Sequence, residues 1–388
     1  MPQSGSSSPD GPPQILVNQT NPYGSLRLVV AWDRATTTAY LLDEPAGSVR
    51  SVLWLANHVP APENFDADEV TFEHAPIMPE NATTHPAGRE PLDPSTLRVI
   101  WFEEGDGLAL VEGSEALAVI PGWVDPGAGF PGFSRDAVGR TRLGWEFGGA
   151  IDALAARVRL ADQYWTWRAT PNAWSGFQQE LLSHLSHRIG QGKRYWAADG
   201  GRMPSIGISE HRGDHARFRV VSTVGMSCQP MPQAEHDAAG EADPPSRIEL
   251  AIATPPVEDQ PDAAVDVLST PLAGASAGAA PEVLTWLGQF PWRELTSLGH
   301  GHTVAWADTT PFPMGPDYHG VLLLDDPALL GGPTPPDLDG HAVEGDPVRW
   351  LWLVPLTAVD FKTVEELGVD PVVGRLRIEG RTWVADTA

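Results

Sequence analysis

Two histidines separated by one glycine, His300 and His302, are the residues best placed for metal chemistry. Side chains two residues apart on a β-strand face the same side, so this pair could share one metal ion, with His319 or His341 as a third ligand. A catalytic zinc site uses three protein ligands and a neighbouring base. We interpret the segment as a polar turn that enters a strand, and we keep a metal-dependent hydrolase that uses His300 and His302 as an alternative.

Other residues of catalytic type lack the neighbours that their chemistry needs. Ser227 follows a Gly-Met pair, but the hydrolase elbow requires Gly-x-Ser-x-Gly, and Gln229 stands at its final position. Cys228 is the single cysteine, which excludes an internal disulfide and a cysteine-based zinc site. The chain also contains no Walker motif and no Gly-x-Gly-x-x-Gly. We therefore expect no catalytic residue, no cofactor and no metal.

Acidic residues dominate the charge of the chain. There are 51 Asp and Glu residues against 25 Lys and Arg, which gives a net charge of −26. This charge opposes binding to nucleic acid, which needs a basic surface, and it favours encounter with a basic protein. The chain begins without the features of a signal peptide, and no apolar run reaches the roughly 18 residues of a membrane span. We expect a cytoplasmic protein that does not enter a membrane, and the Arg, Ala, Gly and Pro usage is typical of a GC-rich bacterial genome.

Acidic turns and two tryptophans are the candidates for contact with a protein partner. Trp165 and Trp167 cannot face the same side of one helix, so we expect one of them at the surface or between domains. The alternative is that the acidic turns are only exposed to solvent and that the tryptophans belong to a hydrophobic core. The candidate residues are Glu103, Glu104, Asp106, Trp165, Trp167, Asp325 and Asp326.

Hydrophobic periodicity divides the chain into two mixed domains. Residues 1–14 are rich in Ser, Gly and Pro and are expected to be disordered, residues 15–170 form a strand-rich domain, and residues 171–388 form a second domain. The strands predicted in the first domain are 26–32, 37–42, 48–56, 97–102, 108–111 and 116–121. Apolar spacing predicts helices over 151–168 and 174–189, and Gly190 and Gly192 end the second one.

The second domain also mixes helices and strands. Its predicted strands are 205–210, 217–225, 247–254, 302–306, 320–324 and 348–354. A helical pattern over 281–298 is broken by Pro291. Thr357 is predicted to cap a last helix over 358–367, which Gly368 and then Pro371 end.

Four pieces of the second domain, in order, resemble the suppressor of fused domain over about 174–376. They are the helix with Leu181, Leu182 and Leu185; the strand ending in 223–227 with Pro230 and Met231; Glu249 and Leu250 followed by the helix with Trp286 and Leu287; and Phe312, 320–324 and 354–357. The resemblance implies an α+β fold with a mostly antiparallel sheet flanked by helices. In bacteria, this domain is found mainly as an immunity module that binds a toxin.

The resemblance and the missing catalytic motifs favour a non-enzymatic protein-binding module. The leading hypothesis is a bacterial immunity protein that neutralises a toxin, with a basic toxin domain as partner. A scaffold that sequesters a regulatory protein and a metal-dependent hydrolase are the alternatives. The sequence leaves open the binding face, the oligomeric state and the role of the N-terminal domain.

Overall fold

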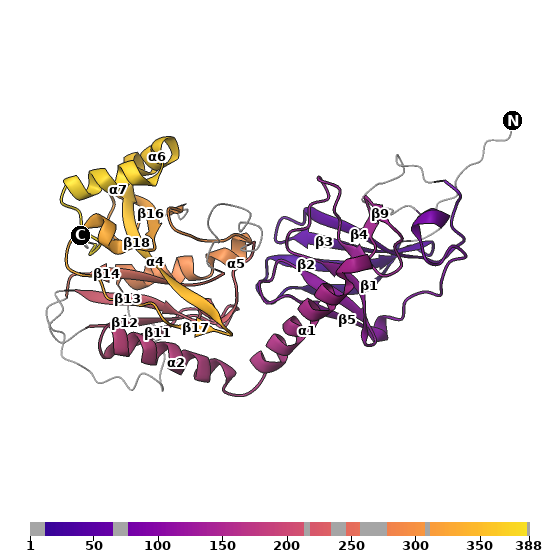
Figure 1. Ribbon diagram of the computed structural model, residues 1–388, viewed down its shortest axis with the longest axis horizontal. Coiled ribbons are helices and arrows are strands. Elements are labelled where there is room, and N and C mark those ends of the chain that lie inside the picture. Colours follow the sequence, from indigo (N-terminus) through magenta and orange to yellow (C-terminus); the bar gives the residue numbers. More distant parts are fainter. Residues whose placement is uncertain are drawn as a thin grey trace. The chain divides into compact units, whose positions relative to one another are not determined.

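The computed structural model describes residues 12–64, 77–212, 218–233, 246–256, 278–306 and 311–385. The chain divides into two compact units, unit 1 (Met1–Trp167) and unit 2 (Arg168–Ala388) (Figure 1). Both units combine helices with sheets, so the α+β expectation is confirmed. Disorder was predicted for residues 1–14, of which residues 1–11 lie outside the described residues; for Gln14 the prediction is wrong, because this residue begins a β-strand.

Unit 1 is built around two sheets whose inner faces are apolar. The first is an antiparallel meander of β1 (Gln14–Thr20), β2 (Leu26–Trp32), β3 (Thr36–Asp43) and β4 (Val49–Asn57). Alternate residues of β2, namely Leu26, Leu28 and Val30, are fully buried, because successive side chains of a strand point to opposite faces. The sequence analysis did not predict β1, an edge strand whose side chains are mostly exposed and therefore give no apolar signal.

The second sheet of unit 1 has the order β5-β6-β7-β8-β10-β9. Its strands are β5 (Leu97–Trp101), β6 (Leu108–Glu112), β7 (Glu115–Ile120), β8 (Phe133–Ser134), β9 (Arg140–Thr141) and β10 (Gly144–Trp145). Short helices η2 (Glu80–Ala82), η3 (Pro94–Thr96) and η4 (Gly148–Ala150) lie in the connections. Helix α1 (Ile151–Arg168) has the bounds that the apolar spacing predicts, and Ala161 and Tyr164 are its buried residues.

Unit 2 contains one large mixed sheet, of order β11-β12-β13-β14-β18-β16-β15, with β17 paired to β18. Its strands are β11 (Gly192–Ala197), β12 (Gly207–His211), β13 (Arg219–Val224), β14 (Arg247–Thr254), β15 (Thr303–Ala305), β16 (Tyr318–Leu324), β17 (Ala342–Val343) and β18 (Asp346–Thr357). Neighbouring strands are antiparallel except for β14 and β18, which run parallel. The sheet is therefore mostly antiparallel, as the resemblance implies.

Helices cover both faces of this sheet. On one face, Val220 and Val224 of β13 share a core with Leu181 and Leu185 of α2 (Ala173–Arg188). Helix α4 (Ala279–Gly288) contacts the same strands, and its Gly288 lies against Thr223, which alternates with those valines and faces the other side. The remaining helical elements are η5 (Met226–Cys228), α5 (Phe290–Glu294), η6 (Pro327–Leu330), α6 (Ala358–Leu367) and α7 (Val369–Ile378).

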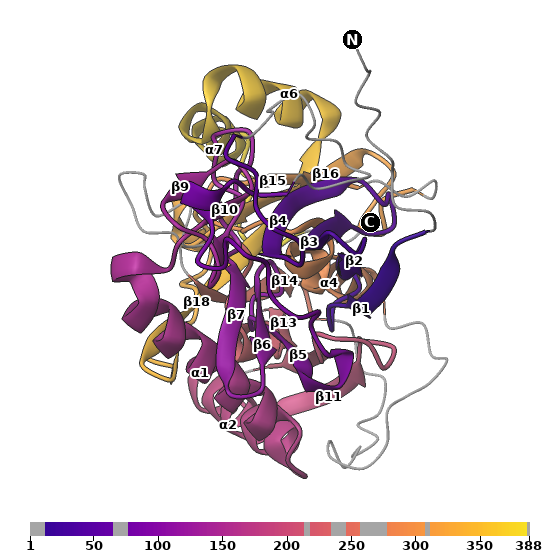
Figure 2. The same ribbon diagram turned by 90° about the vertical axis from the view of Figure 1, so that its right-hand side faces the viewer.

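The C-terminal helices confirm one prediction and correct another. Thr357 and Asp360 form a capping box, and α6 spans the predicted residues up to Gly368. However, α6 is not the last helix, because α7 follows directly after Gly368 and packs beside α6 (Figure 1, Figure 2). Pro371 is the third residue of α7, and proline is tolerated in a first turn, where backbone N–H groups have no partner within the helix.

Candidate functional site: an acidic groove in unit 2

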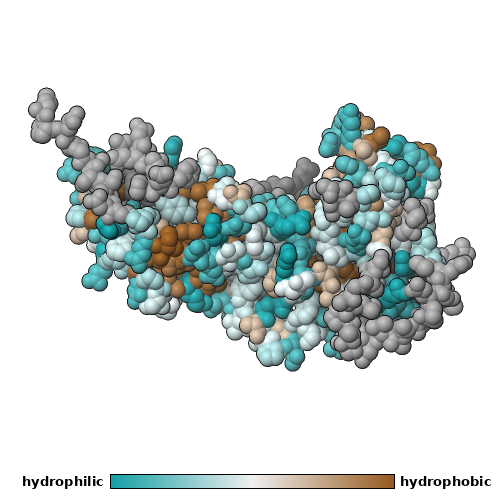
Figure 3. Space-filling model, turned by 180° about the vertical axis from the view of Figure 1, so that it is seen from behind, coloured by the Kyte–Doolittle hydropathy of each residue, from teal (hydrophilic) through white to brown (hydrophobic). Residues whose placement is uncertain are grey.

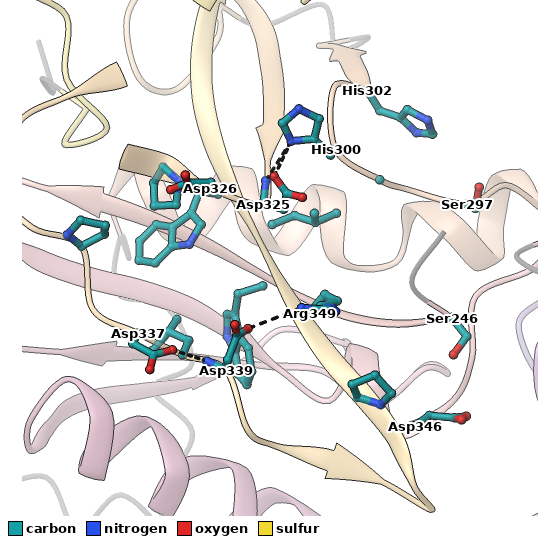
Figure 4. A pocket seen from close by; sticks show the side chains of 18 of the residues that line it. Ser246, Ser297, His300, His302, Asp325, Asp326, Asp337, Asp339, Asp346 and Arg349 are labelled. Atoms are coloured by element: carbon teal, nitrogen blue, oxygen red, sulfur yellow. Dashed lines mark hydrogen bonds and ion pairs between the residues drawn. The ribbon is translucent and has the colours of Figure 1, made fainter. Parts of the chain in front are cut away.

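The candidate site is a groove with a volume of about 1500 Å³ on unit 2 (Figure 4). Its walls include the turn before β15, the end of β16, a proline-rich loop before β17 and the first half of β18, and Gln233 and Ser246 also line it. Five carboxylates line it, and Arg349 is the single Lys or Arg among the described lining residues. The residues that carry the argument are His300, His302, Asp325, Asp326, Asp337, Asp339, Asp346, Arg349 and Leu351.

Strand β18 provides one wall. Trp350 and Trp352 are buried, belong to the core beneath α2 and also border the groove. Leu351 borders it as well and is fully buried. Arg349 is exposed, so it is the side chain of this stretch that presents a charge to the groove.

Two acidic residues lie where β16 ends. Asp325 Oδ1 is 2.5 Å from His300 Nδ1, and the imidazole belongs to the turn before β15. Asp326 caps the short helix η6, where its side chain accepts a hydrogen bond of 2.9 Å from the Ala328 N–H. Both were predicted as contact residues, and both are exposed. Their role in partner binding stays a prediction.

Two further carboxylates stand in the loop before β17, apart from the first pair in Figure 4. Asp337 Oδ1 accepts a 3.0 Å hydrogen bond from the Asp339 N–H, which fixes the loop locally. Asp337 Oδ2 lies 3.4 Å from Arg188 Nη1 of α2, and Asp339 Oδ1 lies 3.9 Å from Arg349 Nη1. The sequence analysis missed both residues, and the alternation of Asp around Leu338 after two prolines was the one local signal.

The fifth carboxylate, Asp346, is linked to the interior of unit 2 through a buried arginine. Arg247 is 3% exposed, and its Nε lies 3.4 Å from Asp346 Oδ2. Its Nη1 donates hydrogen bonds of 3.0 Å to the carbonyl oxygens of Ser227 and Cys228 in η5. The position of this groove residue thus depends on the η5 turn.

A fully buried carboxylate, Glu249 of β14, stabilises the η5 turn. Its oxygens accept hydrogen bonds from the Gly225 N–H, the Ser227 N–H and the hydroxyls of Ser227 and Thr223. Burial raises the pKa of Glu249, and the four donors act in the opposite direction. Ser227 is therefore occupied as a structural donor, which agrees with the absence of a hydrolase elbow in the sequence.

The predicted contact turn of unit 1 is engaged within its own unit. Arg157 of α1 pairs with Glu103, at 2.7 Å, and with Glu104, and its guanidinium lies 4.3 Å from the centre of the Phe102 ring. Asp106 is 5% exposed. Burial raises the pKa of Glu104 to about 8; Arg157 opposes this shift, whereas Glu103 and Asp106 add to it. This geometry gives the turn a local role in holding α1, and contact with a partner stays a prediction for these residues.

The two tryptophans of α1 lie in different surroundings, as helical spacing predicts. Trp165 is partly buried, and its Nε1–H donates a 2.7 Å hydrogen bond to the Trp101 carbonyl oxygen. Trp167 is 39% exposed and packs beside Tyr164. Whether either ring binds a partner stays a prediction.

The two histidines of the metal hypothesis both precede β15, so they do not alternate along a strand. The turn contains Gly301 with φ +82°, a conformation that glycine adopts readily. His300 directs Nδ1 to Asp325, and the His302 ring lies apart from it (Figure 4). Within the ranges that the structure describes, no group of three His, Cys, Asp or Glu residues is arranged to hold a metal ion. The geometric premise of shared coordination on a strand is therefore not met.

Comparison with known proteins finds one family match, which lies within unit 2. The family model described as "Suppressor of fused protein (SUFU)" matches residues 203–388. A solved structure described as "the Sufu-Fu complex crystal structure" is similar at 14% sequence identity, with a TM-score of 0.35, over 54% of this chain and 89% of that chain. No curated protein matches the chain. Among the described helices, none is long and apolar enough to cross a membrane. Residues 203–388 therefore match the suppressor of fused family, which agrees with the motif resemblance over about 174–376.

Proposed function

We propose that this chain is a bacterial immunity protein that binds a toxin and neutralises it through the acidic groove of unit 2. The observation that carries the proposal is the charge of the groove, which presents five carboxylates and one guanidinium on a protein-binding domain. The net charge of −26 supports the same reading, because it attracts a basic partner from a distance.

Neutralisation requires no chemistry from this chain. A partner that places its own catalytic cleft against an acidic groove loses access to its substrate, and a nuclease-type toxin carries the basic surface that such a groove attracts. Electrostatic complementarity of this kind speeds association and rejects partners of the wrong charge. The proposal therefore predicts fast, salt-sensitive binding.

Affinity capture tests the proposal. The full chain serves as bait in lysate of its own organism, and mass spectrometry identifies the retained proteins. The gene of a stoichiometric partner is then expressed alone and together with this chain. We expect the partner to arrest growth alone and growth to recover on co-expression. A captured partner that is harmless alone would overturn the immunity reading and favour the scaffold that sequesters a regulator.

A further inference from the structure

The carboxylates of the groove are accessible and only weakly satisfied within unit 2. The side chains of Asp337 and Asp339 are 72% and 73% exposed, and those of Asp325 and Asp346 are 59% and 55% exposed. The arginines beside three of them stand at distances of 3.4 to 3.9 Å. Arg247 beside Asp346 is buried, whereas the pairs of Asp337 with Arg188 and of Asp339 with Arg349 lie at the surface. Surface pairs contribute little to stability, so the carboxylates of Asp337 and Asp339 are available to a better-placed cation.

The size of the groove argues against a small ligand. Pockets for small molecules have volumes of roughly 300–1,000 Å³, whereas this groove reaches about 1500 Å³ and is open. Its carboxylates are spread over three segments of the chain and are not gathered at one point (Figure 4). A single cation would meet only a part of them, but a segment of polypeptide can meet several in succession.

The nature of the surface favours polar recognition. In the space-filling view from behind, a large hydrophobic area lies on unit 1, and the described part of unit 2 on this face mixes hydrophilic and hydrophobic residues (Figure 3). In the groove, apolar contact comes from prolines, among them Pro335, Pro336 and Pro347. Charged side chains with long apolar stems suit such a lining, because the stem packs on the prolines while the charged head reaches the carboxylates.

We propose that the groove takes an extended, arginine-bearing segment of the partner protein, with at least two arginines that pair with Asp337 and Asp339. Arginine fits better than lysine, since its planar guanidinium forms two parallel hydrogen bonds with one carboxylate. The bound guanidinium takes over Asp339 from Arg349, whose own contact is the longest of those in the groove, at 3.9 Å. This inference rests on the proposed function and specifies which part of the partner is recognised.

The test measures binding of a fluorescein-labelled nonapeptide with three arginines among glycine and serine, by fluorescence anisotropy at low salt. A peptide with glutamine in place of each arginine is the neutral probe. We expect the full chain to bind the arginine peptide and not the glutamine peptide. The double variant Asp337→Asn/Asp339→Asn removes two charges yet keeps a side-chain oxygen at position 337 as acceptor for the loop, and we expect it to bind about tenfold more weakly.

Two further variants distinguish the effect of the groove carboxylates on peptide binding from the effect of the total charge of the chain. Glu365→Gln/Glu366→Gln removes the same number of charges from the exposed face of α6, outside the groove, and we expect a change of less than about twofold. Arg349→Gln removes the competing cation, and we expect binding about threefold tighter. Loss of fold weakens binding in every variant, so a gain on Arg349→Gln is specific to the groove.

The inference is overturned if the arginine peptide does not bind, if the two double variants weaken binding equally, or if Arg349→Gln weakens it. The proposed function has a separate outcome. If a growth-arresting partner is captured equally by the wild-type chain and by Asp337→Asn/Asp339→Asn, the immunity role stands and this mode of recognition fails. If no such partner exists, the immunity role fails whatever the peptide does.

Discussion

Replacing the buried Glu249 by alanine is expected to cost unit 2 about 3–5 kcal/mol of unfolding free energy. The side chain is fully buried and accepts four hydrogen bonds of 2.6 to 3.0 Å. Alanine leaves the N–H groups of Gly225 and Ser227 without that acceptor, at about 1–3 kcal/mol for each buried donor, and the cavity adds to the cost. The hydroxyls contribute less because they rotate, and Thr223 already lies 3.4 Å from another acceptor, the Leu250 carbonyl oxygen.

Glutamine at the same position separates hydrogen bonding from charge. Glutamine keeps one side-chain oxygen as acceptor for the N–H groups of Gly225 and Ser227. We therefore expect Glu249→Gln to lower the free energy of unfolding by less than Glu249→Ala does. Burial raises the pKa of Glu249 above its ordinary value of 4.5. A carboxyl with a raised pKa holds its proton more tightly in the folded state, so its contribution to stability falls as pH rises from 4.5 toward the folded pKa. Glutamine does not titrate, and the deficit of Glu249→Gln should therefore shrink as pH rises through that range.

Urea unfolding, monitored by hydrogen-exchange mass spectrometry, measures these changes in unfolding free energy. Peptides from β13 and β14 report unit 2 separately from unit 1, and the measurement is made at about pH 5 and about pH 8 on the full chain. The matched control is Glu365→Ala on exposed α6, expected to lie within about 0.5 kcal/mol of wild type. A Glu249→Ala chain within about 1 kcal/mol of wild type would refute the reasoning. So would a deficit of Glu249→Gln that grows with pH.

Three other substitutions test the fold and the titration of unit 1. Gly225→Ala should lower the free energy of unfolding, measured by thermal unfolding, by more than about 2 kcal/mol, because φ is +121° and the new Cβ would overlap the Trp174 ring. Gly374→Ala, with open space around this position of α7, should instead raise the free energy of unfolding by about 0.5–1 kcal/mol. Thr357→Ala removes half of a capping box, so we expect a loss of about 1 kcal/mol and faster hydrogen exchange in α6. The pKa of Glu104 is raised to about 8, so this carboxyl stabilises the folded unit less as pH rises. Between about pH 6 and pH 9, the unfolding free energy of wild-type unit 1 should fall by about 1–3 kcal/mol relative to that of Glu104→Gln, as measured by hydrogen exchange of β5 and α1.

Each of these three predictions has a result that contradicts it. Equal melting temperatures for the two glycine variants would remove the steric argument at position 225. Unchanged exchange in α6 would mean that the Asp360 side of the box and the pair with Arg375 suffice to hold the helix. A difference between wild type and Glu104→Gln that is constant with pH would show that this carboxyl does not titrate near pH 8.

Local elements of this protein were predictable because their causes are local. Helix α1 follows from apolar spacing, and α6 follows from Thr357 before it and Gly368 after it. The order of short motifs in the second domain was enough to indicate the suppressor of fused family, which the family model supports over residues 203–388. Edge strands β1 and β11 were missed because a strand that is not fully buried carries no clear alternation.

Pairing and the groove were decided by tertiary structure. Nothing in the local pattern of β14 indicates that β18 runs parallel beside it, since that pairing joins segments about a hundred residues apart. The same crossover brings Asp346 beside Arg247. Sequence periodicity reports which side of an element is buried, so it was enough for most helices and most strands, although not for α7. It carries no information about which distant loops share a surface, and the five carboxylates line one groove only because the folded sheet brings their three segments together.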